Sequence, residues 1–351
     1  MDREFYLGLA KKGLRMPVGT DLVLKEKADH EAILQDGRRL GEVVEEAARR
    51  FGTPLGVQLM DLTLEKEWML QRLGVEASQI ATFHFDKCPD EQMLRRLSGT
   101  AELSSRLRAN CESIGYIAKH TDLVPAGMSI GPFSLMTKLV ADPITPVYLA
   151  GTGMTGGDDE EVRMIERVLE MAQMVVMQSI EAQIHAGAKA IFVAEPAANK
   201  VYFSPKQLAE GTDIFERYAM AGNRRIKRLL DEHGVDLVFH CCGELIDEMV
   251  MQFASLDPAI LSLGSSRKLW EDARLVSRRT VLFGNLPTKR FSTDELSKED
   301  VERMARELME KMRKTGHPFI LGSECDVLSV PGAEGKIRGK VEAFMRCGCG
   351  K

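Results

Sequence analysis

The chain of 351 residues has 44% hydrophobic and 28% charged residues, as ordinary globular proteins do, and it could hold one large barrel or two smaller domains. Its formal net charge of -5 offers no basic surface, so we expect no nucleic-acid partner. No apolar run is long enough to span a membrane, and the N-terminus has no signal-peptide core, so we expect a cytoplasmic protein. The number of cysteines, seven, is odd, so we expect reduced thiols rather than a disulfide framework.

Short apolar runs alternate with longer amphipathic stretches along the chain, which is the pattern of repeated βα units. The predicted strands are Leu55–Met60, Gln79–Phe85, Leu123–Ile130, Ala190–Ala194, Val235–Cys241, Ile260–Gly264, Val281–Gly284 and Phe319–Leu321. The predicted helices include Arg38–Phe51, Asp159–Ala186, Pro205–His233, Glu244–Phe253 and Lys298–Thr315. Ser297, followed by acidic residues up to Asp300, has the residue types of a helix start.

Strands of this number and spacing favour a single (β/α)8 barrel of the TIM type. The alternative is a doubly wound open sheet, but the first strand–helix turn has no Gly-x-Gly-x-x-Gly phosphate cradle. No repeat or linker divides the chain, so we expect one barrel domain over 1–351, with 1–50 as an N-terminal helical extension. The glycine-rich segment Gly151–Gly157 is interpreted as a flexible loop over the site mouth, with phosphate binding as the alternative.

Polar residues follow or end many of the predicted strands. In a parallel barrel these positions meet at one face, where catalytic groups lie. One such residue could simply mark a strand that reaches solvent, but a set of six indicates a site. The six are Asp61, Glu195, His240, Cys242, Asn285 and Cys325.

His240, Cys241 and Cys242 form the most specific pattern among these residues. Residues two apart on an extended strand point the same way, so His240 and Cys242 could hold one ion while Cys241 faces elsewhere. Imidazole and thiolate are ligands that zinc prefers, and three protein ligands leave a fourth position open for substrate. Cys325 could complete the set from a later strand. A buried His-x-Cys pair without metal is the alternative.

With these residues the sequence resembles the uroporphyrinogen decarboxylase superfamily, and within it the zinc-dependent corrinoid methyltransferases. The resemblance spans nearly the whole chain. It rests on Gly131-Pro-Phe-Ser-Leu135, His240-Cys-Cys-Gly243, Gly284-Asn-Leu-Pro287, Gly322-Ser-Glu-Cys325 and Lys336-Ile-Arg338. Members of this branch are (β/α)8 barrels whose zinc is held by a His-x-Cys pair and a distant cysteine, which match His240, Cys242 and Cys325.

The resemblance implies a zinc methyltransferase that moves a methyl group between methylcobalamin or a corrinoid protein and a small thiol, such as coenzyme M, or a methoxylated compound. Asp61 and Glu195 are the candidate catalytic carboxylates, as substrate-orienting groups or general acids, and Glu195 could also be a fourth ligand. The cavity is expected to be mixed apolar and weakly polar, lined partly by Met60, Phe133 and Tyr202.

Two departures from the superfamily pattern bear on the alternatives. The main alternative is a uroporphyrinogen decarboxylase-like lyase. The stretch Ala10–Pro17 lacks the arginine-rich motif that binds porphyrinogen carboxylates in such enzymes, which argues against this alternative. Ser323-Glu324 stands before Cys325 where the zinc branch more often has Pro-Gly, which leaves the substrate open. A barrel kept only for binding is the third possibility.

Overall fold

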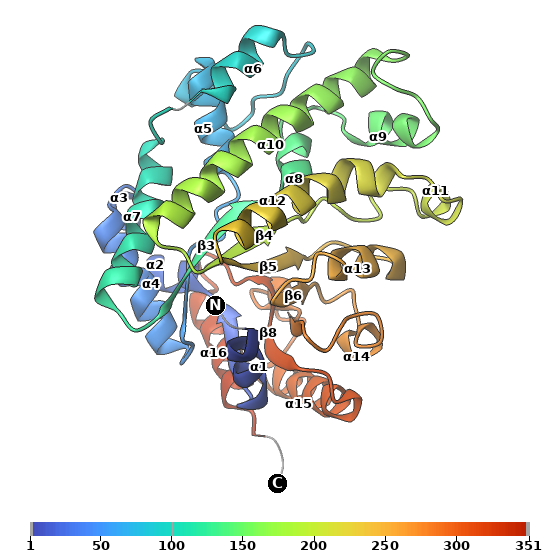
Figure 1. The fold of residues 1–351 in the computed structure, drawn as a ribbon. Helices are drawn as coiled ribbons and strands as arrows, with labels where there is room; N and C mark the ends of the chain where they lie inside the picture. The colour runs from blue at the N-terminus through green and yellow to red at the C-terminus, as the bar shows by residue number, and fades with distance from the viewer. Residues whose placement is uncertain (1–2, 100, 349–351) are drawn as a thin grey trace.

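The computed structural model describes residues 3–99 and 101–348, which fold around one parallel eight-stranded sheet (Figure 1). The strands are hydrogen-bonded in the order β1-β8-β7-β6-β5-β4-β3-β2. The hydroxyl of Thr20, just after β1, donates to the carbonyl of Val57 in β2 at 2.8 Å, so the two ends of this order meet and the barrel is nearly closed. The strands are β1 (Arg15–Val18), β2 (Leu55–Val57), β3 (Val124–Ile130), β4 (Ala190–Ala194), β5 (Asp236–Cys241), β6 (Ile260–Leu263), β7 (Val281–Leu286) and β8 (Phe319–Asp326).

The helices lie outside the strands, as a parallel barrel requires (Figure 1). They are α1 (Arg3–Lys11), α2 (Thr20–Leu24), α3 (His30–Ile33), α4 (Gly37–Arg50), α5 (Leu64–Leu73), α6 (Glu91–Ser98), α7 (Ser105–His120), α8 (Pro132–Thr137), α9 (Ile144–Gly151), α10 (Glu160–Ala186), α11 (Pro205–Ala209), α12 (Ala221–Glu232), α13 (Asp247–Ala254), α14 (Leu269–Asp272), α15 (Lys298–Thr315) and α16 (Glu334–Arg346). Short helices of other types are η1 (Ala77–Gln79), η2 (Glu216–Met220) and η3 (Thr288–Arg290). No helix in the described ranges is long and apolar enough to cross a membrane.

The predicted barrel is confirmed, but one of its predicted strands is wrong. Residues 79–85 form no strand: they follow η1 through turns, and Phe83 packs edge-on against Phe85 with ring centroids 5.0 Å apart. The strand that the prediction missed is β1, which has four residues and includes Pro17. Within the described residues β1 pairs with β8 alone, and at such an edge a residue without an N–H group is tolerated. The N-terminal fifty residues, expected as a helical extension, thus contribute a strand to the barrel.

The predicted helices also meet one correction. The segment 205–233 is not one helix, because Gly211 after α11 adopts a left-handed φ of 85° and the chain resumes as η2 and α12. By contrast, α15 has its predicted bounds. Ser297 accepts a hydrogen bond from the Asp300 N–H at 3.0 Å, and the Asp300 carboxylate accepts one from the Ser297 N–H at 3.0 Å, which completes a capping box.

Helix α1 closes the N-terminal end of the barrel. Tyr6 is fully buried in the cluster that fills the barrel interior, together with Leu55, Phe192 and Val281 from three strands. Its hydroxyl lies 2.9 Å from the Asp236 carboxylate at the start of β5. A larger apolar cluster packs between the strands and the outer helices. The opposite, C-terminal end of the strands is therefore the end left for a site.

Candidate metal centre

All six predicted strand-end residues lie at the C-terminal end of the barrel. Asp61 and Glu195 follow β2 and β4, His240 and Cys242 lie at the end of β5, and Asn285 and Cys325 are the penultimate residues of β7 and β8. Because every strand pair is parallel, these ends share one face. The six residues differ in their contacts, and they divide into a candidate metal-ligand group, called the metal-ligand group below, and residues that bind other parts of this end of the barrel.

His240, Cys242 and Cys325 form the metal-ligand group. Each offers one ligand atom, and these atoms all lie within 4.8 Å of one another. One nitrogen and two sulfurs at this spacing suit a tetrahedral zinc ion, whose bonds are about 2.3 Å to sulfur and about 2.1 Å to nitrogen, with one position left for a substrate. His240 and Cys242 lie at the end of β5 and Cys325 lies on β8, and β6 and β7 separate these two strands in the sheet.

The two strands present their ligands differently. On β5, Val238 belongs to the interior cluster and Leu237 and Phe239 to the outer one, so His240 continues the interior series. On β8 the register with β1 shifts: Met16 pairs with Gly322 and Val18 with Asp326, two steps along β1 against four along β8. The extra residues of β8 lie between Gly322 and Asp326, so Cys325 lies within an irregular stretch of the kind often found near functional sites.

The imidazole of His240 is fixed by its neighbour on β6. Its Nδ1 lies 2.8 Å from the Ser262 hydroxyl, and the residue is 1% exposed. Its Nε2 is buried and has no hydrogen-bond partner among the described residues. Buried polar atoms are normally paired, and a metal-binding histidine characteristically uses its second nitrogen in this way. The residues present therefore fit a bound zinc ion.

Cys241 points away from the group, as predicted. It is fully buried in the outer cluster, between the barrel and the helices, and its sulfur lies 3.7 Å from the carbonyl of Ala198. Burial raises the pKa of its thiol well above the usual range. Cys241 is therefore a packing residue, and the adjacent cysteines have different environments.

Electrostatics favour a thiolate at Cys242. A hydrogen bond from the Cys325 thiol holds the pKa of Cys242 well below its usual range. His240 and the positive charge of Lys289 also lower this pKa, whereas burial raises it. The same bond raises the pKa of Cys325. Burial alone would lower the pKa of Lys289, but the charges of Cys242, Glu324 and Cys325 outweigh it and raise this pKa. Sequence reasoning missed Lys289, because nothing in its position after Pro287 indicates where its side chain points.

Glu195 is held by the protein rather than by the metal-ligand group. Its Oε1 accepts a hydrogen bond from the Ser134 N–H at 2.5 Å and its Oε2 from the Asn223 amide at 2.9 Å. A Cβ on Gly131 would lie 2.0 Å from Oε2, so only glycine fits beside it. The side chain is fully buried, and burial raises its pKa to about 7 against these hydrogen bonds. Glu195 thus fastens the turn after β3 and helix α12 to the end of β4.

Asp61 lies at the rim of the barrel mouth. It forms an ion pair with Arg106, which also binds Glu67 at 3.0 Å, and it accepts a hydrogen bond from the Thr63 N–H at 3.1 Å. Its neighbour Met60 reaches the metal-ligand group, where its sulfur lies 3.9 Å from that of Cys325. Phe133, which we expected in the cavity lining, is instead fully buried and packs against Phe203 and edge-on against Tyr202.

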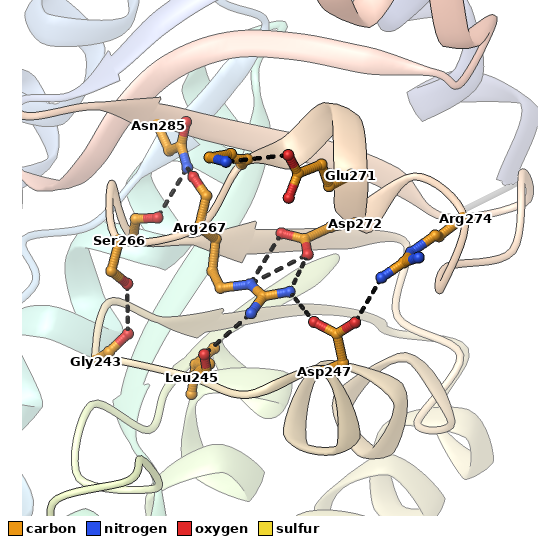
Figure 2. A network of polar contacts seen from close by, with 11 residues as sticks. Gly243, Leu245, Asp247, Ser266, Arg267, Glu271, Asp272, Arg274 and Asn285 are labelled. Carbon is orange, nitrogen blue, oxygen red and sulfur yellow. Dashed lines mark hydrogen bonds and ion pairs between the residues drawn. The ribbon is translucent and has the colours of Figure 1, made fainter.

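Asn285 ties the loops around the site together. Its amide donates to the carbonyls of Gly264 at 2.8 Å and Arg267 at 2.9 Å. Figure 2 shows how Arg267 extends this network to Asp272, to Asp247 at 2.7 Å and to the carbonyl of Leu245 at 3.0 Å. The loop after β6 is thereby bound to the loop that follows Cys242.

Glu324 connects the same loops from β8. Its carboxylate accepts hydrogen bonds from the Ser265 hydroxyl at 2.6 Å and from the backbone N–H of Lys289 at 3.3 Å. It is 5% exposed, so the hydrogen bonds compensate for a charge removed from water. Glu324 therefore ties the loop after β6 and the start of η3 to β8, next to Cys325.

The fold and the site together define a class of protein: parallel eight-stranded barrels with a His/Cys group at the C-terminal ends of the strands. Residues 18–333 match the uroporphyrinogen decarboxylase (URO-D) family, and the chain belongs to that family.

Solved structures resemble the chain in fold. A methyltransferase from Methanosarcina mazei aligns with a TM-score of 0.66 and 16% identity, over 97% of this chain and 98% of that one. A B12-independent methionine synthase from Shewanella sp. W3-18-1, in complex with selenomethionine, aligns with a TM-score of 0.46 and 16% identity, over 67% of this chain and 65% of that one. No curated protein matches the chain in sequence.

Proposed function

We propose that the protein is a zinc-dependent methyltransferase that moves a methyl group between methylcobalamin or a corrinoid protein and a small thiol or methoxylated compound. The observation that carries this proposal is the unpartnered, buried Nε2 of His240 beside the sulfurs of Cys242 and Cys325. When bound, zinc would supply a Lewis acid that lowers the pKa of a substrate thiol or polarises a methyl-ether oxygen.

The residues around the metal-ligand group suit this chemistry. His240, Cys242 and Cys325 would hold zinc with two thiolates, which cancel its charge, so an anionic substrate group would leave the centre with an excess negative charge. The ammonium of Lys289, which faces Cys242 and Cys325, would offset that charge. Asp61, at the rim, would orient the substrate, and Glu195 would act as a positioning residue that holds the ends of β3 and β4.

Membership of the URO-D family and the fold shared with a Methanosarcina mazei methyltransferase support an enzyme of this kind. The family match also favours a second candidate, a decarboxylase of tetrapyrroles. Such an enzyme needs fixed cations for several carboxylates. Arg15 is the arginine in the stretch 10–17, and its guanidinium binds the carbonyl of Met345 at 3.2 Å, at the N-terminal end of the barrel and away from the mouth. This placement favours the methyltransferase.

The test is a methyl-transfer assay on purified protein that has been loaded with zinc or treated with a chelator. Demethylation of methylcobalamin is followed by absorbance with a panel of thiols, and the reverse direction with methoxylated aromatics. We expect turnover that depends on zinc and on one class of acceptor or donor. Decarboxylation of uroporphyrinogen by chelator-treated protein would instead establish the lyase.

A further inference from the structure

A basic cleft lies beside the barrel mouth, on the far side of the Asp61–Arg106 ion pair. Its volume is about 610 Å³, and the charged or titratable residues that line it are Lys66, Glu67, His84, Arg106 and Lys138. These come from α5, from the turns after η1, from the start of α7 and from the turn after α8. The basic cleft is separate from the metal-ligand group, because none of its lining residues belongs to that group.

Lys66 of the basic cleft is buried at a cost in free energy. Lys66 is only 8% exposed, and its ammonium donates to the carbonyl of Ala81 at 3.3 Å. An ammonium has three N–H donors, so this one carbonyl leaves capacity for a further acceptor. Burial and the positive charge of Lys138, which lines the same cleft, both lower the pKa of Lys66.

The carboxylate of the cleft does not neutralise these lysines. Glu67 binds Arg106 at 3.0 Å, and across residues 3–99 and 101–348 neither Lys66 nor Lys138 has a carboxylate within ion-pair distance. Arg106 is paired with both Glu67 and Asp61, so the unpartnered charge of the lining is that of its two lysines, Lys66 and Lys138. Buried charges are normally paired, so two lysines without a carboxylate favour a bound anion.

The segment 77–84, which overlaps the wrongly predicted strand Gln79–Phe85, forms the apolar wall of the basic cleft. Ala77, Ile80 and Ala81 line it beside the two lysines, and the Ala81 carbonyl holds the Lys66 ammonium in place. The cleft thus combines a cationic end with an apolar surface, which suits an organic molecule with a charged head.

We propose that the basic cleft binds the phosphate group of a phosphorylated small molecule. A phosphate monoester carries about -1.5 to -2 charges at neutral pH, which matches the two unpartnered lysines, whereas a sulfonate or a carboxylate carries one. Lysine binds phosphate as a point charge and arginine by a planar fork, and both are present. This site needs no zinc, so it does not depend on the proposed methyl transfer.

The test is calorimetric titration of the full chain with inorganic phosphate, phenyl phosphate and benzenesulfonate. We expect saturable one-to-one binding of both phosphates, with phenyl phosphate tighter and benzenesulfonate weaker. Lys66→Met and Lys138→Met should each weaken phosphate binding by about tenfold, the loss expected for one charge-assisted contact. Lys206→Met, which removes a lysine with an 84% exposed side chain on α11, is the matched control and should leave the affinity unchanged.

The outcomes separate this site from the metal centre. Equal phosphate affinity in wild type and Lys138→Met, or no saturable binding, would overturn the proposal. Equal affinity for benzenesulfonate would overturn its dianion specificity. Lys138 is half-buried, so its substitution is expected to fold even if Lys66→Met does not. Zinc content is measured on every variant and should not change, so loss of phosphate binding cannot be mistaken for failure of the proposed function.

Discussion

The hydroxyl of Ser262 on β6 lies 2.8 Å from Nδ1 of His240 on β5 and so leaves Nε2 as the ring nitrogen available to an ion. Contacts of this kind orient a ligand and typically contribute about 10- to 100-fold to metal affinity. We therefore expect Ser262→Ala to weaken zinc binding by about that factor, measured by competition with a chromophoric chelator. Ser255→Ala, which removes an exposed hydroxyl on the outside of the barrel, should bind zinc as wild type does. Unchanged affinity in Ser262→Ala would mean that the imidazole needs no support.

Lys289 is expected to control the reactivity of Cys242 in zinc-free protein. Its positive charge favours the Cys242 thiolate, so Lys289→Met should raise the pKa of that thiol. The pH profile of Cys242 alkylation by iodoacetamide, followed by peptide mass spectrometry, should shift its midpoint upward by about half a pKa unit, which slows alkylation by about threefold at pH values below the midpoint. Lys289→Arg keeps the charge and should react at nearly the wild-type rate. If Met and Arg variants react alike, the charge has no such role.

Glu65 should make the stability of the fold depend on pH. It is 1% exposed, its Oε1 accepts hydrogen bonds from the hydroxyls of Ser129 at 2.8 Å and Ser179 at 2.9 Å, and burial raises its pKa from 4.5 to about 7. Below pH 4.5 the carboxyl is protonated in both the folded and the unfolded chain. As the pH rises further the unfolded chain ionises first, so the free energy of unfolding falls until the folded carboxyl also ionises near pH 7.

The expected loss from Glu65 is up to about 3 kcal/mol, on the scale of 1.36 kcal/mol per pKa unit. Glu65→Gln should remove this part of the pH dependence. Urea unfolding near pH 5 and pH 8 measures it, and the decline should be smaller in the variant by roughly that amount. Glu232→Gln, at an exposed position on α12, should decline as wild type does. Parallel profiles for wild type and Glu65→Gln would show that Glu65 ionises normally in the fold.

Periodicity and composition were sufficient to predict the barrel, because most of its strands are continuous apolar runs. These runs are flanked by segments whose apolar residues recur with the period of a helix. The same rule misplaced residues 79–85, where Ile80, Phe83 and Phe85 are apolar but pack from turns onto the outer cluster. It also missed β1, whose four residues include a proline and are too short to show alternation. Edge strands and packed turns are distinguished by tertiary contacts, which a single sequence does not contain.

The ligand group could be predicted because His240 and Cys242 share a strand and Cys325 ends another. Its geometry depends on features that no spacing rule specifies. The irregular stretch of β8 that contains Cys325 appears only in the register with β1. The direction of the Lys289 side chain depends on how Glu324 fixes its backbone N–H. Both Glu195 oxygens bind protein donors, the Ser134 N–H on α8 and the Asn223 amide on α12, which lie far from Glu195 in the sequence.

The most direct test of the central claim compares zinc content in single cysteine variants of the purified, refolded and zinc-dialysed protein. Cys242→Ser and Cys325→Ser each remove one sulfur of the metal-ligand group, whereas Cys241→Ser changes the adjacent thiol that lies against Ala198. We predict about one zinc per chain in wild type and in Cys241→Ser, and nearly none in the other two. Circular dichroism on all four proteins separates loss of metal from loss of fold. Wild-type protein without zinc, or equal zinc in Cys241→Ser and Cys242→Ser, would contradict a metal centre built on His240, Cys242 and Cys325.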